Sequence, residues 1–309
     1  MDLRVFTEPQ QGTTFSALAT FAERSEQLGF DGFFRSDHYH LIGDAAPKPS
    51  VSDAWVTLGA LATKTSTIRL GTLMTSATFR LPGPLAVTVS QVDQMSAGRV
   101  ELGIGAGWFE REHRAFAIPF PRVKERFDRL EEQLEIIEGL WATGEGEFFD
   151  YAGRYYRLEH CPMVFRPVQE PHPPVIIGGH GPRRTPALAA RFASEFNMSG
   201  GNFKDVVEQF ARVVAACRDI GRDPASLTRS LWMTTCIGRD EAEFARRAAV
   251  IGREPDELKQ HGIAGLPAQA LAALNECRQA GASRVYLQFL DLEDLAHLEL
   301  AAEVLGSAD

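Results

Sequence analysis

The chain has 309 residues, of which 44% are hydrophobic and 24% are charged, as in ordinary soluble globular proteins. Its formal net charge of −9 disfavours nucleic acid as the main partner, because phosphate backbones require a basic surface. The sequence lacks any uninterrupted apolar run of about eighteen residues, so we expect no membrane span. The first residues predict a strand and not a secretion signal. Four widely spaced cysteines without a Cys-x-x-Cys motif are typical of reduced thiols, so we expect a cytoplasmic protein.

Short apolar runs alternate with longer helical periods along nearly the whole chain. Strands are predicted over residues 3–6, 30–36, 68–74, 99–105, 174–178, 195–199, 231–237 and 283–289. Helices are predicted over residues 14–28, 52–63, 84–95, 121–141, 183–192, 205–220, 241–251, 267–280 and 292–305, with Ser52 as the cap of the second.

The alternation pauses over residues 142–173, where a hairpin turning at Ala152 and Gly153 is predicted. We interpret this segment as an insertion, because regular units resume after it. Eight successive strand–helix units predict a single (β/α)8 TIM barrel over residues 1–309, with the insertion hairpin after the fourth unit. An open eight-stranded sheet is the alternative fold.

Asp37 and His38 directly follow the second predicted strand. In a TIM barrel, catalytic residues lie at this carboxyl end of the strands. Histidine suits proton transfer because its ring titrates near neutral pH, although single histidines at strand ends also serve structural hydrogen bonds. His38 and His40 also have the His-x-His spacing of metal-dependent barrel hydrolases, for which Asp291 and His180 would complete the ligand set.

A glycine-rich turn over residues 178–181 connects the fifth predicted strand to its helix. Free backbone N–H groups and the positive helix end suit a phosphate there, and Arg183 and Arg184 would add positive charge. The alternative is a tight turn with both arginines in solvent. Glycines at 103, 105 and 107 do not match a dinucleotide fingerprint, since Trp108 follows them. They leave room for a flat molecule or another backbone, or they serve barrel packing alone.

Several segments together resemble the luciferase-like superfamily of flavin- and deazaflavin-dependent barrel enzymes, most closely its actinobacterial coenzyme F420-dependent type. The resemblance covers nearly the whole chain. It is carried by Leu28-Gly29-Phe30-Asp31-Gly32, Ser36-Asp37-His38, Ile68-Arg69-Leu70-Gly71-Thr72, Gly98-Arg99-Val100-Glu101-Leu102-Gly103-Ile104-Gly105-Ala106-Gly107-Trp108, Lys124-Glu125-Arg126-Phe127 and Pro174-Val175-Ile176-Ile177-Gly178-Gly179.

The resemblance implies that an isoalloxazine-type ring lies across the carboxyl ends of the strands, with its ribityl phosphate in the 178–181 turn. It implies Asp37 and His38 as catalytic residues beside the ring, and a cis non-proline peptide bond between Leu73 and Met74. The cofactor-binding residues that it implies are Asp37, His38, Leu73, Met74, Gly105, Ala106, Gly107, Trp108, Gly178, Gly179, His180 and Gly181.

The chain departs from the members of this family that oxidise sugar phosphates. Those members carry a proton-donating glutamate where this chain has Trp108, and lysines after strands six and seven that this chain lacks. A sugar phosphate is therefore disfavoured. With Phe79, Phe109 and Met198 near the predicted pocket, a fairly apolar organic substrate is favoured, and His38 becomes the expected proton donor.

Our leading hypothesis is hydride transfer between coenzyme F420 and such a substrate, with His38 as acid/base and Asp37 orienting its ring or holding the coenzyme. An FMN-dependent monooxygenase that takes reduced flavin from a partner reductase and uses O2 is the main alternative. A metal-dependent hydrolase using His38 and His40, and a non-catalytic flavin-binding protein, are the others. The resemblance also implies a homodimer.

Overall fold

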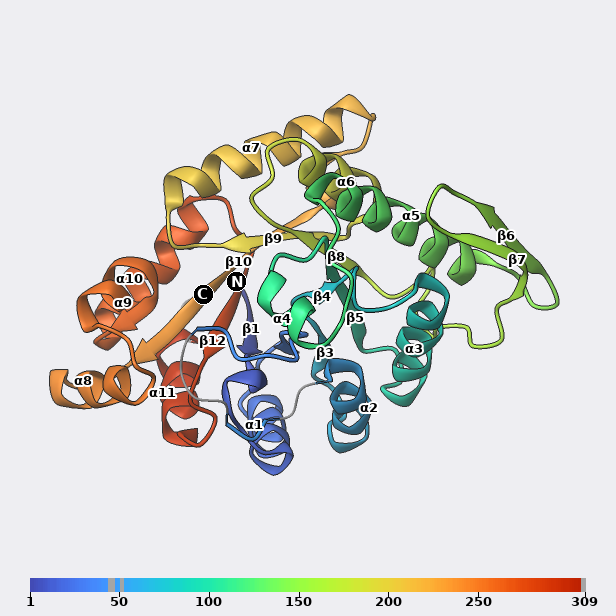
Figure 1. Cartoon of the computed structure of the whole chain (residues 1–309). Helices are drawn as coiled ribbons and strands as arrows, with labels where there is room; N and C mark the ends of the chain where they lie inside the picture. The colour runs from blue at the N-terminus through green and yellow to red at the C-terminus, as the bar shows by residue number, and fades with distance from the viewer. Residues whose placement is uncertain (44–47, 51–52, 307–309) are drawn as a thin grey trace.

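The computed structural model describes residues 1–43, 48–50 and 53–306, in which parallel strands close into a barrel surrounded by helices (Figure 1). Strand β12 pairs with β1 at one side of the closure, and β10 pairs with β9 at the other. The barrel confirms the predicted TIM-barrel fold and excludes the open sheet. Its strands are β1 (Asp2–Thr7), β2 (Gly32–Arg35), β3 (Arg69–Thr72), β5 (Val100–Gly105), β8 (Val175–Gly178), β9 (Glu195–Ser199), β10 (Thr228–Ile237) and β12 (Arg284–Phe289).

The predicted helices form the outer layer of the barrel. They are α1 (Phe15–Gln27), α2 (Ala54–Lys64), α3 (Pro82–Met95), α5 (Val123–Ala142), α6 (Arg184–Phe192), α7 (Phe203–Asp219), α8 (Glu241–Val250), α10 (Pro267–Gln279) and α11 (Leu295–Leu305). Helix α2 is capped by Asp53, whose side chain accepts the Val56 N–H at 3.0 Å. The expected cap Ser52 lies outside the described residues. None of the helices in the described ranges is long and apolar enough to cross a membrane.

The hairpin β6 (Phe148–Ala152) and β7 (Arg157–Pro162) follows α5 in the chain and lies next to that helix, outside the barrel (Figure 1), as predicted for the insertion. Its turn is closed by the Gly153 N–H, which donates to the Tyr156 carbonyl at 2.9 Å. Short elements were not predicted from the sequence. They are α4 (Glu110–Ala115), α9 (Pro255–His261), β4 (Thr75–Ser76), β11 (Ile263–Gly265) and the 3-10 turns at Pro9–Gln11 and Pro224–Ser226.

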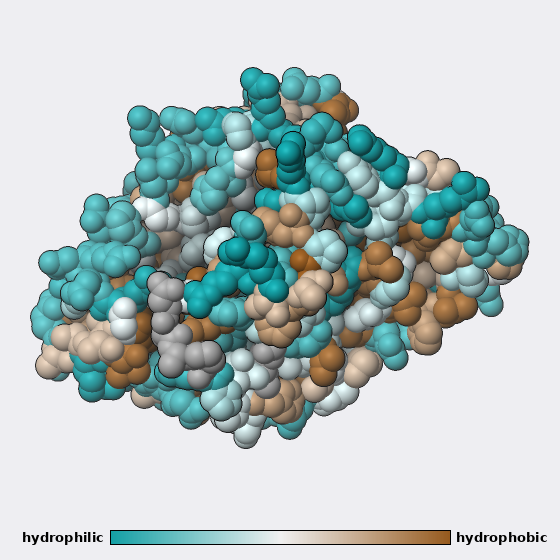
Figure 2. Space-filling model, in the orientation of Figure 1, coloured by the Kyte–Doolittle hydropathy of each residue, from teal (hydrophilic) through white to brown (hydrophobic). Residues whose placement is uncertain are grey.

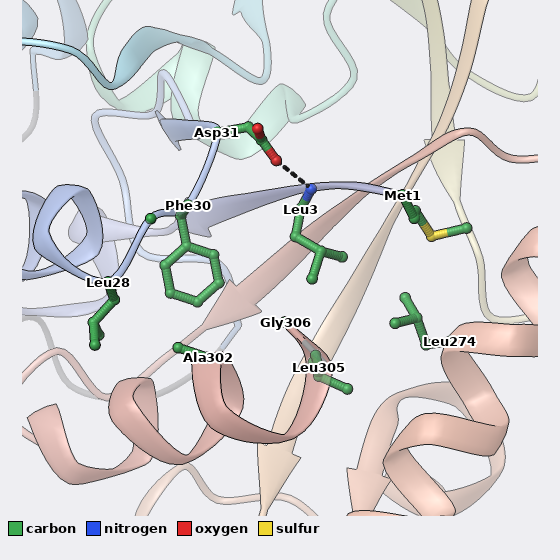
Figure 3. Close-up of a pocket in the computed structure, with 10 residues that line it drawn as sticks. Met1, Leu3, Leu28, Phe30, Asp31, Leu274, Ala302, Leu305 and Gly306 are labelled. Atoms are coloured by element: carbon green, nitrogen blue, oxygen red, sulfur yellow. Dashed lines mark hydrogen bonds between the residues drawn. The ribbon is translucent and has the colours of Figure 1, made fainter. Parts of the chain in front are cut away.

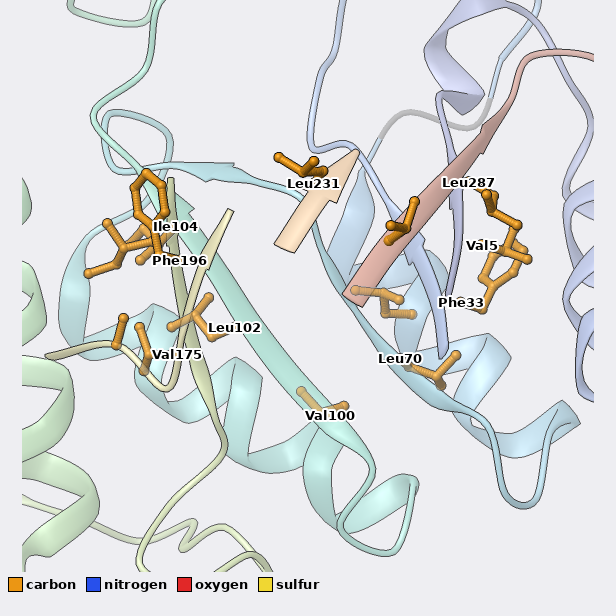
Figure 4. Close-up of a cluster of buried hydrophobic side chains, with 14 of the residues drawn as sticks. Val5, Phe33, Leu70, Val100, Leu102, Ile104, Val175, Phe196, Leu231 and Leu287 are labelled. Atoms are coloured by element: carbon orange, nitrogen blue, oxygen red, sulfur yellow. The ribbon is translucent and has the colours of Figure 1, made fainter. Parts of the chain in front are cut away.

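The main hydrophobic core lies between the strands and the helices. Because side chains alternate along a strand, Val5, Leu102 and Leu287 point outward from β1, β5 and β12 (Figure 4). The intervening residues fill the barrel interior, where Phe34 and Tyr286 contact edge to face at 5.0 Å between ring centroids.

Paired charges close the amino-terminal end of the barrel. The Arg4 guanidinium donates to Glu101 at 2.7 Å, and Arg284 is ion-paired with Glu195. Burial opposes ionisation of Glu101, yet the neighbouring arginines hold its pKa below the ordinary carboxyl value. These four largely buried charges thus compensate one another at this end of the barrel.

A small cavity of about 280 Å³ lies outside the strands at this end, against α11 (Figure 3). Asp31 provides its one charged side chain, and that carboxylate already accepts the Leu3 N–H at 2.8 Å. The other described side chains that line the cavity are apolar.

Candidate functional site

A larger cavity of about 710 Å³ opens at the carboxyl ends of the strands. It is lined by every cofactor-binding residue implied by the family resemblance, from Asp37 to Gly181. In the view of Figure 1 the short helix α4 lies in front of the barrel, and apolar side chains gather in the middle of this face among polar ones (Figure 2). The fold therefore brings these twelve residues together around one cavity.

His38 is oriented by Glu112, which the sequence analysis missed. The ring Nδ1 of His38 lies 2.9 Å from Glu112 Oε2, and this carboxylate is completely buried. Its other oxygen accepts the backbone N–H groups of Tyr39 and, at 2.9 Å, His40. Because a carboxylate only accepts, Nδ1 carries the proton, and Nε2 is left for the cavity.

Asp37 does not orient His38, contrary to one of the roles predicted for it. Its fully buried carboxylate is ion-paired with Arg80 and accepts the Thr75 hydroxyl at 2.9 Å. Burial opposes the charge of Arg80, but Asp37 raises the pKa of this guanidinium. Asp37 thus lines the cavity as a carboxylate paired with Arg80, and this pair connects the segment after β2 to the segment after β4.

Glu8, which follows β1, contributes a second carboxyl group to the cavity. Burial raises its pKa, while the nearby His38 and Arg253 side chains lower it by less. The cavity therefore holds a carboxyl group that keeps its proton to higher pH than an ordinary glutamate, close enough to His38 to sense its charge.

The predicted phosphate turn is held from behind by Gln209 of α7. The side-chain Nε2 of this buried glutamine donates to the Gly179 carbonyl at 3.3 Å and to the Gly181 carbonyl at 2.9 Å. In a trans peptide unit the N–H points away from the carbonyl, so the His180 N–H is turned away from Gln209. The backbone of Gly179 has φ +127°, a conformation that favours glycine.

The two arginines after this turn do not line the cavity. Arg184 is ion-paired with Asp128 and, at 3.1 Å, with Glu131 of α5. Arg183 is exposed at the start of α6. The positive charge expected from them is thus directed to the barrel surface, and the turn offers backbone donors instead.

The glycines of β5 serve two purposes. A Cβ at Gly103 would lie 2.0 Å from the Thr72 carbonyl oxygen, so this glycine permits close strand packing. A Cβ at Gly105 would meet nothing closer than the Met74 sulfur at 4.0 Å, so the cavity is open there. The peptide bond between Leu73 and Met74 is cis, as the family resemblance implied.

The residues of the metal-hydrolase alternative do not converge. His38 and His180 line the cavity, whereas His40 and Asp291 do not. His40 donates from Nδ1 to the Leu41 carbonyl at 2.7 Å, and Asp291 accepts the Glu293 N–H at 3.0 Å. The described part of the chain contains no group of three or more His, Cys, Asp or Glu side chains that could hold a metal ion.

The barrel and its site define a class of protein: the chain belongs to the luciferase-like monooxygenase family, whose model matches residues 1–302. It is 35% identical over 214 residues to the F420-dependent glucose-6-phosphate dehydrogenase of Microbacterium testaceum, a match covering 69% of this chain and 60% of that relative. It is 30% identical over 238 residues to the F420-dependent hydroxymycolic acid dehydrogenase of Mycobacterium tuberculosis, covering 76% of this chain and 62% of that relative. The chain thus spans about three fifths of the length of these relatives.

A solved F420-dependent secondary alcohol dehydrogenase, in complex with an F420–acetone adduct, superposes with a TM-score of 0.85. The superposition covers 100% of this chain and 99% of that structure at 19% sequence identity. At this identity the match supports the fold alone.

Proposed function

We propose that the protein is an oxidoreductase that transfers hydride between coenzyme F420 and a small, fairly apolar organic substrate. The observation that carries the proposal is the His38–Glu112 pair, which directs a ring nitrogen into an otherwise largely apolar cavity. The two relatives named above are both F420-dependent dehydrogenases, which supports the same coenzyme here.

The residues of the cavity fit such a coenzyme. The backbone N–H groups of His180 and Gly181 would bind its phosphate, and the open space beside Gly105 would accept its flat ring. Leu73 and Met74 would support the ring from the strand-three side. When bound, the coenzyme supplies hydride chemistry at its ring.

The side chains of this protein then manage the accompanying proton. With Nδ1 fixed by Glu112, His38 Nε2 accepts a proton from a substrate hydroxyl or returns it to a carbonyl oxygen. The aromatic rings of Trp108 and Phe109 pack edge-on against His38, at 5.8 Å and 6.0 Å between centroids, and keep the imidazole in place. Glu8, with its raised pKa, is a second proton-bearing group within the cavity.

The test is turnover of reduced F420 with menadione, an apolar quinone, as acceptor. The His38→Ala variant should lose about 10²-fold or more in turnover and keep its coenzyme affinity, because general acid/base groups contribute on this scale. The matched control is His40→Ala, whose ring lies outside the cavity. Unchanged turnover in His38→Ala would remove this residue from the mechanism.

The second candidate is an FMN-dependent monooxygenase supplied with reduced flavin by a partner reductase and using O2. The family description favours it, and the same glycine turn suits the FMN phosphate. Oxygen consumption with reduced FMN, together with tighter binding of FMN than of F420, would favour this candidate over the first.

We also propose a cytoplasmic homodimer. The four cysteines are free, and three of them are buried, which fits a reducing compartment. Light scattering after size-exclusion chromatography should give twice the chain mass of 34.0 kDa.

A further inference from the structure

One positively charged side chain reaches the proposed substrate site. Arg253 is the one arginine or lysine among the described residues that line the large cavity. Its ion pair with Glu257 is long, at 4.0 Å, and both side chains are about half exposed. Such a pair contributes little, so the guanidinium keeps donors for a ligand.

The backbone fixes Arg253 at the rim of the barrel. Helix α8 ends with Gly252 at φ +66°, and the Arg253 N–H donates to the Ala248 carbonyl at 3.0 Å. Pro255 then begins α9. The arginine therefore lies on a short, hydrogen-bonded connection between two helices.

Gln288 adds a donor inside the cavity. Its side chain is buried in β12, and its Oε1 accepts the Thr234 hydroxyl at 2.6 Å. This bond leaves the Nε2 hydrogens without an acceptor in the described part of the chain, and Gln288 lines the cavity. This amide N–H group can therefore donate to a ligand in the cavity.

Two other polar side chains of this cavity come from neighbouring strands. Gln288 is paired in register with Phe6 of β1, and the Glu8 carboxyl follows directly after β1. Arg253 and Glu8 both line the cavity, where the positive charge of Arg253 favours the ionised form of the Glu8 carboxyl group. Strand β1 lies across the barrel from β8 and its glycine turn.

We propose that the substrate carries a carboxylate on an apolar body, and that Arg253 and Gln288 bind this carboxylate. The inference rests on the proposed function and narrows its substrate class. A guanidinium and an amide N–H together recognise an oxyanion, and one cation matches a single negative charge. The aromatic side chains of Phe79, Trp108 and Trp232 surround the remaining volume and suit an apolar body.

The sequence did not indicate Arg253 as a cavity residue. It disfavoured a sugar phosphate, since lysines are lacking after the sixth and seventh predicted strands, and favoured a fairly apolar substrate. Arg253 lies after α8 and not directly after a strand, so inspection of the residues that follow each strand does not find it.

The test compares octanoate, 1-octanol and octyl phosphate as probes in calorimetric titrations at pH 7.5, with and without saturating F420. The wild-type protein should bind octanoate at least about tenfold more tightly than octanol, the scale of one charge-assisted hydrogen bond. The Arg253→Ala variant should lose this preference, and Gln288→Leu should lose part of it. The control Arg246→Ala, an exposed arginine of α8 outside the cavity, should keep it.

Equal affinity for octanoate and octanol, or a preference that survives in Arg253→Ala, would overturn the proposal. Tighter binding of octyl phosphate than of octanoate would show that the anionic group of the substrate is a phosphate and not a carboxylate. A loss of F420 affinity in Arg253→Ala would assign the arginine to the acidic groups of the coenzyme. If the protein does not bind F420 but still prefers octanoate to octanol, the proposed function is refuted and the carboxylate site remains supported.

Discussion

Replacing Glu112 by glutamine isolates the role of the carboxylate that orients His38. The variant keeps the shape of the side chain, and its remaining oxygen can still accept the Tyr39 and His40 N–H groups. Its amide nitrogen, however, would face His38 Nδ1 with hydrogens of its own. His38 Nδ1 would then have to accept, so the ring proton would move to Nε2, which faces the cavity.

The size of the effect follows from these contacts. Exchanging a fully buried, charge-assisted hydrogen bond for a neutral one should reduce the free energy of unfolding by about 2 kcal/mol. Turnover with menadione should fall more, by about 10²–10⁴-fold, because the neutral amide no longer stabilises the imidazolium that donates a proton to the quinone oxygen. Coenzyme affinity should stay unchanged, since Glu112 contacts the segment after β2 and not the glycine turn.

The assay combines turnover of reduced F420 with menadione and nitrogen-15 NMR of the histidine rings. The wild-type spectrum should show His38 protonated at Nδ1, and Glu112→Gln should shift the proton to Nε2. The control Glu110→Gln changes an exposed glutamate of the same helix and should alter neither readout. A Glu112→Gln protein that keeps both the Nδ1–H form and full turnover would refute this reasoning.

Two further predictions concern stability. Burial lowers the pKa of His297 to about 3, whereas an unfolded histidine titrates near 6.5, so the unfolded chain binds the extra proton between these values. Acidification over this range should therefore reduce the free energy of unfolding by up to about 1.4 kcal/mol per pH unit. Urea titrations of the His297→Gln variant should lack this component. If the free energies of unfolding of wild type and variant fall in parallel with pH, the prediction is wrong. Arg80→Met leaves the Asp37 charge buried and unpaired and should cost about 3–5 kcal/mol in the same assay, much of which Asp37→Asn should restore. If Arg80→Met reduces the free energy of unfolding by less than about 1 kcal/mol, the Arg80–Asp37 pair does not contribute to stability as predicted.

The sequence predicted the barrel because strand and helix periods are local signals. Apolar alternation, with a glycine or polar residue at the end, was enough to recognise each strand. The order of the strands in the barrel then follows their order in the chain. The glycine turn and the Asp37–His38 stretch were found for the same reason, since they directly follow strands that were recognised.

The partners of these residues could not be predicted in the same way. Glu112 lies on a six-residue helix whose pattern is too short to recognise, and it meets His38 across a sequence separation of 74 residues. Gln209 of α7 contacts the glycine turn, and Arg253 reaches the cavity from the connection between α8 and α9, so only the closed barrel brings them to the site. The pairing of Asp37 with Arg80 could not be predicted, because nothing local in the sequence indicates it.

The central claim is that this cavity binds coenzyme F420 for hydride transfer, and a paired titration tests it most directly. Purified protein is titrated with F420 and with FMN, and Gln209→Leu, which frees the carbonyls of the glycine turn, is titrated in parallel. We expect saturable F420 binding that is at least about tenfold tighter than FMN binding and that weakens in Gln209→Leu. Tight FMN binding without affinity for F420 would contradict the account.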